Sequence, residues 1–136
     1  MSSYVYPIEH PGEILTRTAN GAVTNKRFVL NNGQQAYATG QKVLGVARDS
    51  RSNGESVAVA IDGTVLVEAG AGIPADAEIM TDSQGRAIRA TRGKYVAGRT
   101  MGSVSGAGYD VEVFLGIGAG TSVLWSTTTT TTTTAP

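Results

Sequence analysis

The chain has 136 residues, a size typical of a single domain, and its hydrophobic content of 40% comes mainly from Ala and Val. Its 11 basic and 11 acidic side chains cancel, which argues against a nucleic acid or an anionic membrane as partner. The absence of cysteine excludes a disulfide framework, a thiolate nucleophile and a cysteine-based metal site. With two Phe, one Trp and 18 Gly, the core is expected to be thin, so self-association or docking on a partner is expected to add stability.

Residues 1–21 are predicted to form an extended N-terminal arm, because prolines interrupt them and they show neither helical periodicity nor a long strand pattern. The alternative is a first edge strand that packs on its own domain. The start of the chain lacks the basic and then apolar order of a secretion signal, so cytoplasmic synthesis is expected. The candidate contact residues of the arm are its apolar side chains and one proline: Tyr4, Val5, Tyr6, Pro7, Ile8, Ile14 and Leu15.

Residues 22–125 are predicted to form a β-rich domain, because short Val, Ile, Ala and Thr runs alternate with turn residues. The predicted class is all-β, a small sandwich or barrel of short antiparallel strands, with one helical turn behind Pro74 left open. Strands are expected, from the arm onward, at 14–18, 27–30, 35–39, 43–47, 56–61, 64–68, 77–81, 87–90, 95–100 and 109–115.

Two of these strands show clear alternation of apolar and other residues, which places every second side chain on an inward face. The strand at 56–61 should bury Val57, Val59 and Ile61, and the strand at 109–115 should bury Val111, Val113 and Leu115. The dipeptides Asn32-Gly33, Asn53-Gly54 and Asp62-Gly63 predict tight turns, since both residue types accept positive φ.

A weak internal echo runs through the predicted domain. The segment 43–48, a Ser/Asn/Gly-rich loop and the strand at 57–61 resemble the segment 95–99, a Gly/Ser-rich loop and the strand at 111–115. A pair of related β units and a chance likeness in a Gly-rich sequence both explain it.

Residues 126–136 differ from the rest, because Thr127 to Thr134 form an unbroken threonine run. Such a low-complexity tract favours a disordered tail, although the β propensity of threonine also allows an extended strand on a neighbour. The longest uncharged stretch, 113–125, is too short for a membrane span and contains three glycines.

The sequence contains no pattern that predicts a catalytic, cofactor or metal site. His10 is the single histidine, so a zinc site would have neither a second histidine nor a cysteine as ligand, and a Ser-His-Asp triad would have to use His10 itself. A surface histidine is the simpler interpretation. The acidic residues are scattered beside turns, although a carboxylate pair formed in space is not excluded. Gly116, Gly118 and Gly120 do not satisfy the dinucleotide-loop pattern, because no helix is predicted after them.

A local concentration of basic residues lies between positions 86 and 99. A solvated or intersubunit face is the first interpretation and nucleic-acid binding the second, since Tyr95 is the one aromatic residue among them. These residues are Arg86, Arg89, Arg92, Lys94 and Arg99.

Over about residues 22–116, the order of the β and turn patterns resembles the capsid cement (head decoration) proteins of tailed bacteriophages. The resemblance depends on the order of the pieces, since each one alone is an ordinary β or turn pattern. The pieces are Arg27-Phe28-Val29, Val43-Leu44-Gly45-Val46-Ala47-Arg48, Gly54-Glu55-Ser56-Val57-Ala58-Val59, Gly63-Thr64-Val65-Leu66-Val67-Glu68-Ala69-Gly70, Thr81-Asp82-Ser83-Gln84-Gly85-Arg86-Ala87, Val96-Ala97-Gly98-Arg99 and Val111-Glu112-Val113-Phe114-Leu115.

The resemblance implies a structural virion protein on the outer capsid surface, without enzyme activity. It implies the major capsid protein and further copies of the chain, as a homotrimer, as partners, with neither nucleic acid nor membrane. A non-catalytic adhesin or carbohydrate-binding β module is the alternative, although Trp125 and the five Tyr are dispersed along the chain. An enzyme or an enzyme accessory domain is the third possibility.

Overall fold

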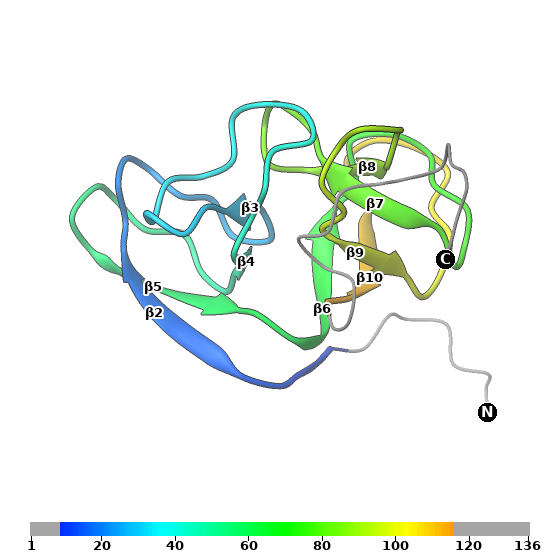
Figure 1. Cartoon of the computed structure of the whole chain (residues 1–136). Helices are drawn as coiled ribbons and strands as arrows, with labels where there is room; N and C mark the ends of the chain where they lie inside the picture. Colours follow the sequence, from blue (N-terminus) through cyan, green and yellow to red (C-terminus); the bar gives the residue numbers. More distant parts are fainter. Residues whose placement is uncertain (1–8, 116–136) are drawn as a thin grey trace, which may run out of the picture.

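The computed structural model describes residues 9–115, which form ten short strands in two antiparallel sheets. The two sheets occupy two lobes that lie side by side (Figure 1). The described residues contain no helix, and so none long enough to cross a membrane. The all-β class predicted from the sequence is therefore confirmed, and the helical turn left open behind Pro74 is not present.

The first lobe holds a four-stranded sheet in the order β2-β5-β4-β3. β2 lies at one edge and pairs along its full length with β5, with Leu15 opposite Val59. β3 lies at the other edge, where Gln35 forms an isolated bridge to Val29. The strands of this sheet are β2 (Ile14–Thr18), β3 (Phe28–Val29), β4 (Gly45–Ala47) and β5 (Ser56–Ala60).

The second lobe holds a six-stranded sheet in the order β1-β6-β10-β9-β7-β8. Its longest pairing joins β6 to β10, with Val65 opposite Val113. A parallel bridge from Ala69 to Ala87 links the end of β6 to β8, so the sheet curls back on itself. The strands are β1 (His10–Pro11), β6 (Gly63–Glu68), β7 (Glu78–Thr81), β8 (Ala87–Arg89), β9 (Gly98–Thr100) and β10 (Asp110–Phe114).

Two sequence predictions differ from the observed strands. The predicted strand at 35–39 is not formed, because Gln41 uses its side-chain oxygen to accept from the N–H groups of Tyr37 and Ala38 and holds them in a loop. Residues 10–18 form β1 and β2, which pair with β6 and β5. For this part of the chain, the edge-strand alternative replaces the free arm.

The two lobes repeat one topology. The order β2-β5-β4-β3 of the first unit (residues 14–61) corresponds to the order β6-β10-β9-β7 of the second unit (residues 63–115). Loop contacts repeat as well. Ala19 donates to Glu55 and accepts from Gly54, and Ala69 donates to Tyr109 and accepts from Gly108. Val23 and Arg51 exchange two hydrogen bonds, as do Ile73 and Val104.

Backbone conformation supports the same correspondence. The two described non-glycine residues with positive φ are Lys26 and Asp76. Lys26 donates its N–H to the carbonyl of Ala47 at the end of β4, and Asp76 donates its N–H to the carbonyl of Thr100 at the end of β9. Gly33 and Gly85 both close a tight hairpin at positive φ. Of the two explanations for the sequence echo, the structure therefore favours a pair of related β units.

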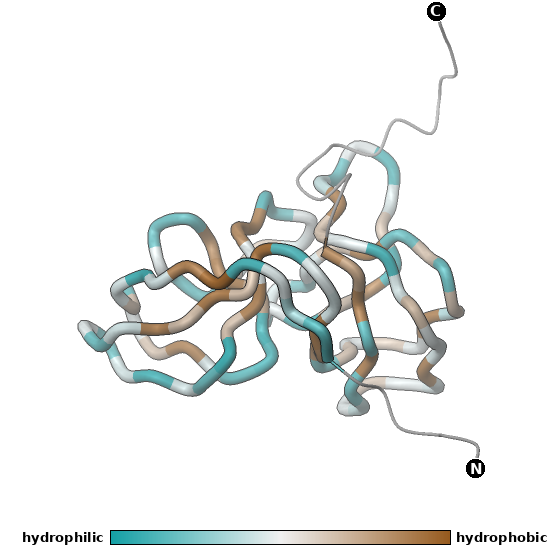
Figure 2. The backbone as a smooth tube through the Cα atoms, turned by 90° about the horizontal axis from the view of Figure 1, so that it is seen from below, coloured by the Kyte–Doolittle hydropathy of each residue, from teal (hydrophilic) through white to brown (hydrophobic). Residues whose placement is uncertain are grey.

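The core is thin and continuous across the lobes. The largest cluster joins Phe28, Val46 and Ala60 of the first unit to Val65 and Val113 of the second. Val57, Val59, Val111 and Leu115 are also buried as predicted, whereas Ile61 is half-buried and follows the end of β5. Figure 2 shows hydrophobic positions recurring along the strands toward the middle of the molecule, whereas the turns at the free end of the first lobe are mostly hydrophilic.

Candidate interaction surface

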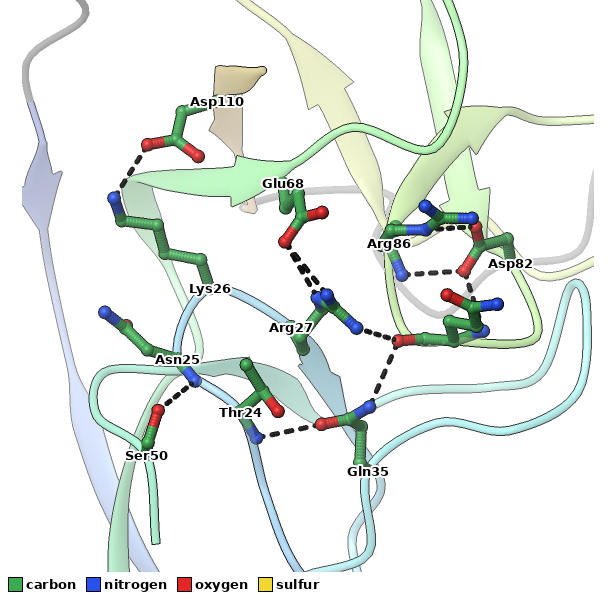
Figure 3. Close-up of polar contacts among 11 residues, drawn as sticks. Thr24, Asn25, Lys26, Arg27, Gln35, Ser50, Glu68, Asp82, Arg86 and Asp110 are labelled. Carbon is green, nitrogen blue, oxygen red and sulfur yellow. Dashed lines mark hydrogen bonds and ion pairs between the residues drawn. The ribbon is translucent and has the colours of Figure 1, made fainter. Parts of the chain in front are cut away.

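A polar seam joins the two units (Figure 3). Lys26 Nζ lies 2.7 Å from Asp110 Oδ2, and the guanidinium of Arg27 donates two hydrogen bonds to Glu68 Oε1, at 2.9 and 3.2 Å. The Gln84 carbonyl accepts from both Arg27 and Gln35. Main-chain bonds run through the same region, from Phe28 N–H to the Gly85 carbonyl and from Glu68 N–H to the Lys26 carbonyl. The seam thus fixes the first unit against the second.

Asp82 organises the turn that the seam uses. Its carboxylate is largely buried and accepts from the N–H groups of Gln84 and Arg86 and from Arg86 Nε, at 2.8 to 2.9 Å. This holds the Gln84 carbonyl where Arg27 can reach it (Figure 3). Sequence reasoning missed the seam. Its one local signal was the Lys26-Arg27 pair, and the acidic partners are far away in the sequence.

The predicted contact residues fall into two groups. Tyr4, Val5, Tyr6, Pro7 and Ile8 lie outside the described residues, so their role stays a prediction. Ile14 and Leu15 lie in β2, where Ile14 is 45% exposed and Leu15 is half-buried. The same extended ribbon continues from β1 into β2 along the margin of the molecule (Figure 1).

The basic concentration predicted at 86–99 does not form one free cationic patch. Arg86 is paired with Asp82 at 2.9 Å. Arg99 lies 3.2 Å from Asp76 and stacks 5.6 Å from the centroid of the Phe114 ring. Arg89, Arg92 and Lys94 are exposed. This distribution fits a solvated or interface surface, which was the first interpretation.

A second surface feature lies on the loop that replaces the predicted strand at 35–39. Tyr37 is exposed there, and Lys42 lies 5.8 Å from the centroid of the Tyr95 ring, because the Gly40 carbonyl accepts from Tyr95 N–H. Beside it, Asn31, Lys42, Val43 and Leu44 line an open hollow of about 400 Å³. Of the four residues that line it, only Asn31 and Lys42 have polar side chains, which is fewer than a catalytic constellation requires.

The described residues offer little chemistry to a substrate or a metal ion. His10 lies exposed in β1 and donates its N–H to Thr64 Oγ1, and no group of three or more metal-ligating side chains occurs within residues 9–115. Six carboxylates form ion pairs with Lys or Arg. In one of these, the hydrogen bond to Asp49 raises the pKa of Arg51. The glycine motif at 116–120 lies outside the described residues.

Comparison with known proteins gives two findings. A family model described as phage cement protein matches residues 10–115, which span both units. The head fiber gp8.5 N base of bacteriophage phi29 has a similar fold, with a TM-score of 0.64 at 18% sequence identity, over 79% of this chain and 96% of that one. No curated protein is significantly similar in sequence.

Proposed function

This chain belongs to the phage cement protein family, and on that premise we propose that it binds the outer surface of a phage head and cements neighbouring capsid subunits. Membership makes it a structural, capsid-associated phage protein. The observation that carries the proposal is the extent of the family match, which covers both β units and the seam between them.

The proposal includes no catalytic step, no cofactor, and no nucleic-acid or membrane partner. It is supported by the ion pairing of the acidic residues and by the balanced net charge, which offers no long-range attraction to polyanions. Synthesis in the host cytoplasm and assembly as a homotrimer belong to the same proposal. Self-association is supported by the core, whose buried side chains are mostly Val and Ala.

The capsid contact is proposed to run along the N-terminal ribbon, from Tyr4 to Leu15. Its apolar and β-branched residues suit a segment that adds a strand to a sheet edge on another protein. A ligand that binds only the assembled head stabilises that head by mass action, which is the physical content of cementing. The threonine run at 127–134 has no apolar anchor and is expected to contribute little.

The test adds purified protein to heads assembled without it and measures co-sedimentation, followed by reconstruction of the decorated heads. We expect density at junctions between capsid subunits, in clusters of three. Deleting residues 2–8 should abolish binding while the β body stays folded, because β1 and Glu9 remain in place. Deleting residues 127–136 should leave binding intact. Isolated copies on the head, or release by the tail deletion alone, would contradict the proposal.

A further inference from the structure

The outer edge of β6 is fully covered by the chain itself. Gly63 accepts from Leu115 and Ala69 donates to Tyr109, so the odd-numbered residues of β6 bond to β10 and the even-numbered ones face away. On that outer side Thr64 pairs with His10 of β1, Leu66 N–H donates to the Glu9 carboxylate at 3.0 Å, and Glu68 N–H donates to the Lys26 carbonyl. Every outward position thus has a partner.

β2 is the counterpart of β6 in the first unit, and among residues 9–115 its outer edge is open at Ile14 and Thr16, whereas Gly33 lies against the Thr18 carbonyl oxygen. Glu13 accepts from Ile61 and Ala19 donates to Glu55, so Ile14, Thr16 and Thr18 face away from β5 by the same alternation. Within residues 9–115, no acceptor reaches the N–H groups of Ile14 and Thr16. Of the two equivalent strand edges, β6 is therefore covered by Glu9 and β1, whereas β2 has no corresponding segment within residues 9–115.

The central carbonyl of the open edge is already occupied. Arg17 Nη1 donates to the Thr16 carbonyl at 3.0 Å, and Arg17 Nε and Nη2 bond to the carbonyl and side-chain oxygens of Asn31. This leaves main-chain N–H groups beside a guanidinium and occupies the central acceptor of the edge. β2 has no proline and an unbroken register with β5, so two of the features that keep exposed edges from pairing, proline and bulges, are missing from it.

We propose that the outer edge of β2 accepts an acidic, extended segment of a capsid subunit, in the way that β6 accepts Glu9 and β1. This inference rests on the proposed function, since the head is the partner. The charge of the edge favours a segment that brings carbonyl and carboxylate acceptors, as Glu9 does for Leu66 N–H and for Arg48. Pairing of β2 with β2 of a second copy is disfavoured, because a second β2 brings another Arg17 and no carboxylate to the edge.

The first test compares two substitutions at the centre of the edge. Thr16→Pro removes the outward N–H, at a position where an edge strand tolerates proline, and Thr16→Val keeps the N–H and the strand propensity. We expect Thr16→Val to bind heads as the native chain does, and Thr16→Pro to bind about tenfold or more weakly with an unchanged oligomeric state. Equal binding by both variants would overturn the inference while leaving the proposed function standing. Failure of the native chain to bind heads would instead remove the proposed function.

A second measurement decides the matter even where Thr16→Pro does not fold. A photoreactive benzoylphenylalanine replaces Thr16 in the full chain, and the cross-linked peptide on decorated heads is identified by mass spectrometry. The expected product joins position 16 to an acidic segment of the major capsid protein. The same group at Met101, an exposed residue of the second unit, serves as the control and should not give that product. A product that joins position 16 to another copy of this chain would overturn the inference.

Discussion

At the level of single residues, two glycines show how closely the paired strands approach. Gly45 of β4 and Gly98 of β9 occupy corresponding places in the two units, and neither has positive φ. A Cβ at Gly45 would overlap the Ala60 carbonyl oxygen, and one at Gly98 would overlap that of Phe114. Both glycines are therefore required for space and not for backbone conformation.

Replacing either glycine by alanine should destabilise the fold. Gly45→Ala and Gly98→Ala are each expected to lower the free energy of unfolding by about 1 to 3 kcal/mol, because a main-chain oxygen cannot move aside without breaking the strand pair. Gly102→Ala is the matched control, since open space surrounds that position. Chemical denaturation measures all three. A loss at Gly45 or Gly98 no larger than at Gly102 would show that the sheets adjust freely.

At the level of elements, the seam determines how the two units are joined. The Arg27–Glu68 pair has side-chain exposures of only 18% and 27% and is tied to the Gln84 carbonyl as well. The Arg99–Asp76 pair is far more exposed, at 51% and 83%. Ion pairs exposed to water contribute little to the stability of a fold, whereas a partly buried pair with two hydrogen bonds contributes more.

A double-mutant cycle should separate these two pairs. We expect Arg27→Met and Glu68→Gln to show a coupling energy of about 1 kcal/mol, and the equivalent cycle at Arg99 and Asp76 to show a coupling near zero. Urea unfolding of the single and double variants gives the coupling. A coupling near zero for the Arg27–Glu68 pair as well would mean that the seam is held by the apolar core and the main chain alone.

At the level of the whole molecule, the two units share one core. Phe28 of the first unit is fully buried in the same cluster as Val65, Ile79 and Val113 of the second. β1, which precedes the first unit, completes the sheet of the second. The two units therefore share the largest hydrophobic cluster, and the sheet of the second unit depends on β1 for one of its strands.

The chain should unfold in one step despite its two lobes. Calorimetry on residues 1–115 is expected to show one transition with equal calorimetric and van't Hoff enthalpies. A fragment of residues 62–115 should remain unfolded, because it lacks Phe28 and β1. Two separate transitions, or a folded fragment, would show that the units are independent domains.

The sequence by itself determined the class of the fold and most of its strands. Alternation marked β5 and β10, where local pattern and burial agree, and β2 was found with its observed bounds. The turns at Asn32-Gly33 and Asn53-Gly54 follow from the freedom of glycine at positive φ. Asp62-Gly63 is instead a bend that leads into β6, where Gly63 also has positive φ. These features depend on neighbours in the chain, so local sequence is enough to predict them.

Only the tertiary structure decided which strands pair, where the seam lies and which edge stays open. β1 has two residues and no pattern of its own, and it is a strand only because Thr64 and Gly63 lie beside it. The loop at 37–41 shows the converse, since side-chain hydrogen bonds from Gln41 override its strand-like composition. The outward N–H groups of β2 and β6 are chemically alike, and within residues 9–115 they differ because segments distant in sequence cover β6 but not Ile14 and Thr16 of β2. Such partners are set by the path of the whole chain, which no local pattern encodes.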